Sequence, residues 1–120
     1  MKTRQHYLDL LAKHVTNPRM IAHCVASEAI LRALARHFGE DEDVWGIAGL
    51  LHDIDVEITA AEPHRHALLA AEMLASEELP AEAIDAIRMH NEMATNEPRT
   101  TRFQHALAAG ETIAGLIFAT

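Results

Sequence analysis

The segment GLLHDIDVE, residues 49–57, joins an apolar, helix-like run directly to three ionisable residues, His52, Asp53 and Asp55. An imidazole or a carboxylate costs free energy to bury unless another group binds it. If the apolar run enters the core, the ionisable groups at its end enter with it. Any fold for this chain must therefore bring binding partners for these groups to the same place.

The rest of the chain has the composition and spacing of an all-α protein. The apolar fraction of 49% is mostly aliphatic and aromatic residues supply only 4%, which favours helices over strands. Apolar residues recur at three- and four-residue steps, and Pro18, Gly39, Pro63 and Pro80 interrupt the pattern. We expect six helices, at about 3–15, 18–38, 40–52, 64–76, 80–90 and 101–119, with connections over 56–63 and 91–100. The length fits a single domain over residues 1–120.

Charge and cysteine content exclude several classes of function. The formal net charge of -8 comes from 18 acidic and 10 basic residues, without a Lys/Arg cluster that could follow a phosphate backbone. Bulk nucleic acid is therefore not an expected partner. Cys24 is the only cysteine, and no signal-like or membrane-spanning run is present. We expect a cytoplasmic protein that has no internal disulfide and does not contact a membrane.

Ionisable residues fall on the apolar faces of the predicted helices. His23 shares a stripe with apolar residues of the second helix, His66 is placed on the fourth, His90 ends the fifth, and Glu111 lies on a mostly apolar face of the last. Six groups then point inward: His23, His52, Asp53, His66, His90 and Glu111. A divalent cation would relieve their desolvation cost, because it binds imidazole and carboxylate at about 2.0 to 2.2 Å. Asp53 has two oxygens and can bridge two ions.

The order of these residues resembles the HD superfamily of metal-dependent phosphohydrolases. The likeness rests on His23, "HD" at 52–53, "RHALLAAEML" around His66, "MHNE" around His90 and "AGETIAGLI" around Glu111, and it spans nearly the whole chain. It is greatest to small stand-alone HD/HDIG-type predicted hydrolases, and it implies a helical bundle around one or two metal ions. It implies that His23, His52, Asp53 and Glu111 hold a first ion. His66 and His90 would hold a second ion with Asp53 as bridge, or would bind substrate phosphate.

Two features depart from the family pattern. Relatives usually carry Asp in place of Glu111, so the extra methylene needs the small neighbour Gly110 or a shifted helix to keep the carboxylate within bonding distance. Relatives also commonly continue after "GLI" with further helices, whereas the last helix here ends in an apolar segment. The helices missing from a shortened chain, or a partner subunit in a homo-oligomer formed through the C-terminal helix, would cover that segment.

The expected function is hydrolysis of a small phosphate ester or nucleotide by metal-activated water. The donor set suits Mn, Fe, Zn, Co or Ni, and Mg is also allowed. With one bound ion, Asp55 or Glu57 would position the water and His66 or His90 would assist the leaving group. Of the arginines, Arg65 is the one expected to reach the substrate phosphate. Two alternatives remain open. One is an HD-type di-iron oxygenase with the same ligands, and the other is a catalytically degenerate module that binds metal or nucleotide.

Overall fold

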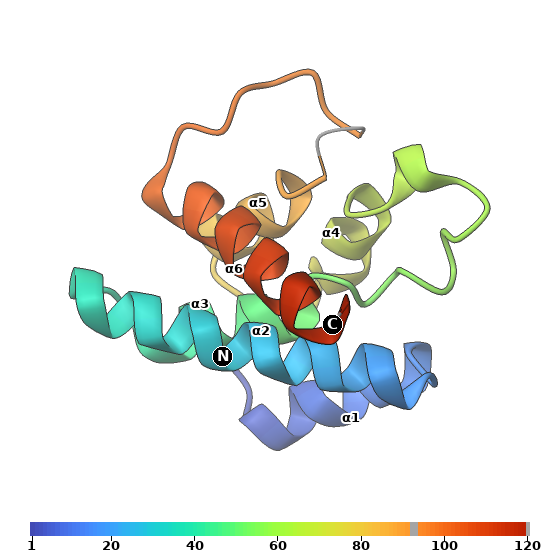
Figure 1. Cartoon of the computed structure of the whole chain (residues 1–120), viewed down its shortest axis with the longest axis horizontal. Coiled ribbons are helices and arrows are strands. Elements are labelled where there is room, and N and C mark those ends of the chain that lie inside the picture. The colour runs from blue at the N-terminus through green and yellow to red at the C-terminus, as the bar shows by residue number, and fades with distance from the viewer. Residues whose placement is uncertain (92–93, 120) are drawn as a thin grey trace.

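The computed structural model describes residues 1–91 and 94–119, and these residues form an all-α bundle (Figure 1). The helices are α1 Arg4–His14, α2 Pro18–Phe38, α3 Glu42–Leu51, α4 Leu68–Leu74, α5 Ala81–Arg88 and α6 Arg102–Ala119, with a short 3-10 helix, η1, at Pro63–Arg65. The predicted fold class is confirmed. Glu92 and Met93, within the predicted connection over 91–100, lie outside the described residues.

The ends of α2 and α3 follow directly from capping residues. The Asn17 side chain accepts hydrogen bonds from the N–H groups of Arg19 and Met20, and Gly39 ends α2 in the left-handed region at φ 71°. The Asp41 side chain caps α3 in the same way. Because α3 ends at Leu51, His52 occupies its C-cap. These caps fix where His23 and His52 stand along their helices.

The two helices that carry His23 and His52 cross at Gly49. A Cβ at this position would lie 2.8 Å from the Ser27 carbonyl oxygen, so the backbones of α2 and α3 are in direct contact there. This close approach sets the rings of His23 and His52 side by side, with centroids 5.5 Å apart. The crossing of α2 and α3 therefore brings together two of the ionisable groups, His23 and His52.

Replacing Gly49 is expected to separate α2 from α3. Gly49→Ala should lower the free energy of unfolding by about 1 to 3 kcal/mol, because the atoms that a Cβ meets belong to backbone that cannot move aside. Gly115 of α6 is the matched control, since a Cβ there has nothing within 4 Å. Gly115→Ala should be neutral or stabilising by up to about 1 kcal/mol. Urea unfolding measures both, and equal stabilities would contradict the crossing described here.

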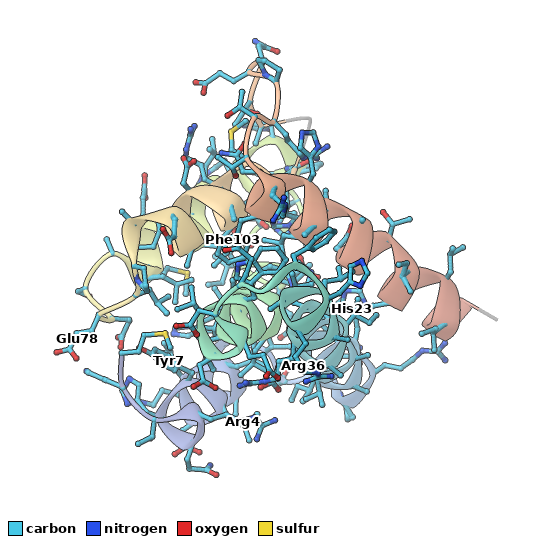
Figure 2. The ribbon with its side chains drawn as sticks, turned by 90° about the vertical axis from the view of Figure 1, so that its left-hand side faces the viewer. Arg4, Tyr7, His23, Arg36, Glu78 and Phe103 are labelled. Atoms are coloured by element: carbon cyan, nitrogen blue, oxygen red, sulfur yellow. The ribbon has the colours of Figure 1, made fainter. Side chains whose placement is uncertain are left out.

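The remaining helices pack on both sides of this pair. In Figure 1, α1 lies on one side of α2 and α3, and α4, α5 and α6 lie on the other. Phe103 of α6 stacks on Trp45 of α3 with centroids 4.9 Å apart, and Figure 2 shows Phe103 and His23 between α6 and the pair. Helix α6 therefore covers the side of α2 and α3 that carries Trp45 and His23.

The prediction that His66 belongs to the fourth helix is wrong. Helix α4 begins at Leu68, and Ala67 before it has a φ of 77°. The Asp55 carboxylate accepts hydrogen bonds from the N–H groups of Ala67 and Ala70 at 2.8 and 2.9 Å, so a residue far away in sequence caps this helix. Helix α5 likewise ends at Arg88, two residues before His90. Both histidines lie on turns beside helix ends.

The apolar end of α6 lies at the surface. Ile113, Leu116 and Ile117 are 45%, 64% and 57% exposed. That further helices or a second copy of the chain cover this segment stays a prediction. Among the described residues, no helix combines the length and the hydropathy needed to cross a membrane.

Candidate metal centre

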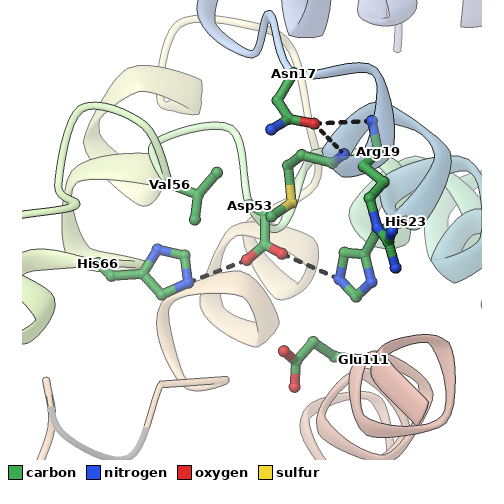
Figure 3. Close-up of a pocket in the computed structure, with 9 residues that line it drawn as sticks. Asn17, Arg19, His23, Asp53, Val56, His66 and Glu111 are labelled. Atoms are coloured by element: carbon green, nitrogen blue, oxygen red, sulfur yellow. Dashed lines mark hydrogen bonds and ion pairs between the residues drawn. The ribbon is translucent and has the colours of Figure 1, made fainter. Parts of the chain in front are cut away.

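Asp53 lies at the centre of four imidazoles, and its two oxygens face different histidines (Figure 3). Its Oδ2 lies 3.2 Å from His23 Nε2 and 3.1 Å from His52 Nε2. Its Oδ1 lies 3.0 Å from His66 Nε2 and 3.5 Å from His90 Nε2. Asp53 is only 5% exposed. One buried carboxylate thus divides four imidazole nitrogens into two pairs.

Helix ends orient two of these histidines. His52 Nδ1 donates to the Gly49 carbonyl at 2.7 Å, and His90 Nδ1 donates to the Ile87 carbonyl at 2.6 Å. Both carbonyls belong to the last turn of a helix, where the backbone offers acceptors without an intrahelical donor. Because a carbonyl oxygen can only accept, Nδ1 carries the hydrogen, and Nε2 of the neutral ring presents a lone pair. That lone pair points toward Asp53 in each case.

Asp55 orients the third histidine. His66 Nδ1 donates to Asp55 Oδ1 at 2.6 Å, while Asp55 Oδ2 accepts the two α4 amide hydrogens. Asp55 is fully buried. A carboxylate that holds the second nitrogen of an imidazole in this way is a recurrent feature of metal sites. The sequence suggested that Asp55 positions water, whereas the structure places its carboxylate behind His66, on the side away from Asp53.

Two groups of side chains could each hold a metal ion. The first is His23, His52, Asp53 and Glu111, and the second is Asp53, His66 and His90; within each group the ligand atoms lie within 4.8 Å of one another. Two atoms bound to one ion at about 2.1 Å are about 3.0 to 3.4 Å apart in octahedral or tetrahedral geometry. The contacts of Asp53 with the four imidazoles fall close to that range.

Two nitrogen contacts in the cluster call for a proton or a metal ion. Among the described residues, His52 Nε2 is a buried atom that makes no hydrogen bond, although Asp53 Oδ2 lies 3.1 Å away. His66 Nε2 and His90 Nε2 lie 3.2 Å apart, and lone pairs at that distance repel unless a proton or a metal ion lies between them. Imidazole nitrogen with carboxylate oxygen is a donor set that first-row transition metals accept. The residues present therefore fit a metal.

The charges of the cluster depend on one another. Burial alone would raise the pKa of Asp53, but the surrounding histidines hold it well below its usual range. Burial alone would lower the pKa of His66, but hydrogen bonds with Asp53 and Asp55 raise it to about 10. Without a metal, a proton therefore occupies His66 at neutral pH.

Metal binding at the second group should release that proton. Because the pKa of His66 is raised to about 10, its ring is protonated below that pH and must lose a proton to ligate. We expect about one proton released per ion near pH 8, and an apparent affinity about tenfold weaker for each pH unit that the solution is made more acidic. Titration calorimetry in buffers of different ionisation enthalpy measures this release. A binding heat that is the same in all buffers would contradict it.

Two residues expected near the chemistry lie elsewhere. The Glu57 carboxylate accepts hydrogen bonds from the backbone N–H groups of Thr16 and Asn17 at 2.7 and 3.1 Å, which ties this loop to the start of α2. The Arg65 guanidinium pairs with Glu62 at 2.6 Å. Neither residue is among the described residues that line the cavity over Asp53. Glu57 has a structural partner and is not brought together with the imidazoles.

A cavity of about 530 Å³ opens over the cluster. Its lining includes the cluster members His23, Asp53, His66 and Glu111, and beside them Asn17, Arg19, Met20, Val56 and Gly115. The sequence reasoning did not single out Arg19. A signal was present, because Arg19 precedes His23 by four residues and so shares its helix face.

The turns that carry His66 and His90 are tied together by a neighbouring amide. Asn91 Nδ2 donates to the carbonyls of Pro63 and His66 at 2.8 and 2.9 Å. The Arg99 guanidinium donates to the carbonyl of His90 at 3.0 Å. These contacts hold two turns from different parts of the chain in one arrangement. The positions of His66 and His90 are therefore fixed by contacts between the turns as well as by the turns themselves.

The comparisons with known proteins agree with this geometry. The family profile described as the HD domain matches residues 20–117, which includes every member of both ligand groups. No curated protein and no solved structure matches the chain. The match covers most of the 120 residues. The chain therefore belongs to the HD superfamily of metal-dependent phosphohydrolases.

Proposed function

We propose that this protein hydrolyses a small phosphate ester or nucleotide with the help of two divalent ions. The observation that supports the proposal most is the division of Asp53, whose Oδ2 faces His23 and His52 and whose Oδ1 faces His66 and His90. Divalent ions bound there would lower the pKa of coordinated water and neutralise charge on the phosphoryl oxygens. The first group would hold one ion, with Glu111 as its further ligand, and the second group the other.

The chain's own residues hold this arrangement in place. Asp55 keeps His66 directed at Asp53, and the carbonyls of Gly49 and Ile87 do the same for His52 and His90. Three of the four imidazoles that face Asp53 are therefore oriented before an ion arrives, and little conformational freedom is lost on binding. Such preorganisation is what a hydrolytic site needs to place a phosphoryl group and water accurately.

The number of ions determines what His66 does. If only the first group is occupied, His66 retains the proton that Asp53 and Asp55 stabilise. His66 lines the cavity and would then donate that proton to the leaving oxygen of the substrate. His90 is 8% exposed and is not among the described residues that line the cavity, so it is less well placed for this role.

Metal reconstitution tests the proposal. The purified protein would be stripped with a chelator, reloaded separately with Mn, Fe, Zn, Co, Ni or Mg, and assayed on p-nitrophenyl phosphate and a panel of nucleotides. We expect turnover that appears only with added metal and reaches saturation near two ions per chain. The His52→Ala variant should stay folded and inactive, because it loses a ligand of the first group.

Two results would contradict the proposal. Metal bound without turnover of any substrate on the panel would favour a module that binds metal or nucleotide without catalysis. An iron-dependent optical or electron paramagnetic signal that responds to oxygen, together with oxygen consumption, would favour an oxygenase, since the mixed nitrogen and oxygen ligands also suit iron.

A further inference from the structure

We infer that Arg19 binds the substrate's phosphoryl group, with its guanidinium contacting a non-bridging oxygen on the side facing α2. This inference rests on the proposed function, because it assigns the anion-binding residue of the same site. Arg19 lines the cavity together with His23, Asp53 and Glu111. Figure 3 shows its side chain extending from the start of α2 beside His23. The Arg19 side chain therefore shares one cavity with three of the candidate metal ligands.

The position of Arg19 is fixed by contacts at the start of α2. Asn17 Oδ1 accepts the backbone hydrogen of Arg19 at 2.9 Å, and Glu57 accepts those of Thr16 and Asn17. Glu57 lies four residues after Asp53, so the same loop that carries the central carboxylate also holds the segment that carries Arg19. These contacts fix the backbone from which the Arg19 side chain reaches the cavity, so the start of the helix does not have to be ordered when the guanidinium pairs with an anion.

The negative charge around the cavity would repel a phosphate, and Arg19 supplies a positive charge there. The protein has a formal net charge of -8, and Asp53 and Glu111 both line the cavity. Among the described lining residues, Arg19 is the single Lys or Arg. A guanidinium offers two parallel N–H groups that match two phosphoryl oxygens. Arg19 would therefore offset the repulsion that an approaching phosphate meets from the two carboxylates.

Arg65 provides a matched control for this role. It is an arginine in the same region of sequence as His66, but it is not among the described residues lining the cavity. The variants Arg19→Ala and Arg65→Ala remove the same charge from the protein. A difference between them therefore reports the position of the guanidinium and not the net charge.

Two measurements on the metal-loaded protein test the inference: the KM and kcat for p-nitrophenyl phosphate, and the affinity for inorganic phosphate by titration calorimetry. Arg19→Ala should weaken phosphate binding and raise KM by about 10- to 100-fold, the usual worth of a charge-assisted hydrogen bond. Arg19→Lys should recover part of the loss, and Arg65→Ala should match wild type. Metal content should be equal in all four proteins, which a structural role for Arg19 at the ligands would not allow.

The two failures can be told apart. If wild type turns over the substrate and Arg19→Ala has the same KM and phosphate affinity, the assignment of Arg19 is wrong while the proposed function stands. A loss in Arg65→Ala as large as that in Arg19→Ala also overturns the assignment. If wild type shows no turnover, the proposed function fails, and the calorimetric comparison still decides whether Arg19 binds phosphate.

Discussion

Asp53→Asn is expected to reduce kcat/KM for phosphate-ester hydrolysis by about 1,000-fold or more, because metal-ion stabilisation of several kcal/mol is lost. The asparagine side chain has nearly the same shape but only one oxygen, so it cannot serve both imidazole pairs. Its NH₂ group would face either the pair at Oδ1 or the pair at Oδ2. Steady-state kinetics with each metal, together with elemental analysis, measures the loss of turnover and of bound metal.

Asp43→Asn is the matched control for this variant. Its carboxylate pairs with Arg32 on the surface and its side chain is 77% exposed, so the same chemical change is made away from the cavity. We expect full metal content and turnover within about twofold of wild type, as for most exposed positions. Far-UV circular dichroism should show that both variants are folded. An Asp53→Asn protein that keeps two bound ions or half of its turnover would contradict the bridging role.

Asp55→Asn should weaken binding of the second ion by about 10- to 100-fold, which is typical when a residue that orients a metal ligand is changed. It should also lower the free energy of unfolding by about 1 to 3 kcal/mol, because an amide cannot accept from both His66 and α4 as the carboxylate does. The pKa of the metal-free His66 ring should fall from its raised value. Histidine NMR titration, calorimetry and urea unfolding measure the three effects.

Thr59→Val is the control that distinguishes an effect of the Asp55 carboxylate from an effect of the surrounding loop. Thr59 Oγ1 donates to the backbone carbonyl of Asp55 at 2.9 Å, so this variant disturbs the same loop without touching the carboxylate. We expect a loss of stability with the titration of His66 and the metal affinity unchanged. If Asp55→Asn and Thr59→Val affect metal binding equally, Asp55 acts only through the loop and does not orient His66.

Most of the helical architecture could be predicted from local sequence. Capping signals at Asn17, Gly39 and Asp41 act within a few residues, so they are readable without the fold. The start of α4 was not readable, because its cap is the Asp55 carboxylate from another part of the chain. A helical pattern that continues through His66 and Ala67 was therefore misleading. Periodicity cannot show that a distant side chain determines where a helix begins.

The candidate site was predictable in its members but not in its connections. Six ionisable groups on apolar faces indicated convergence, and the structure brings all of them into the two groups around Asp53. The sequence could not show which carboxylate stands behind which histidine, and so the contact of Asp55 with His66 was missed. The partners of Glu57 and Arg65 depend equally on tertiary contacts. Patterns locate polar groups in the core, whereas pairing is set by packing.

A crystal structure of the metal-loaded protein, with anomalous diffraction recorded on both sides of the metal's absorption edge, tests the central claim most directly. The structure presented here predicts two anomalous peaks that share Asp53. One should contact Oδ2 together with His23 and His52, and the other should contact Oδ1 together with His66 and His90. Metal found only at other side chains, with hydrogen bonds alone around Asp53, would contradict it.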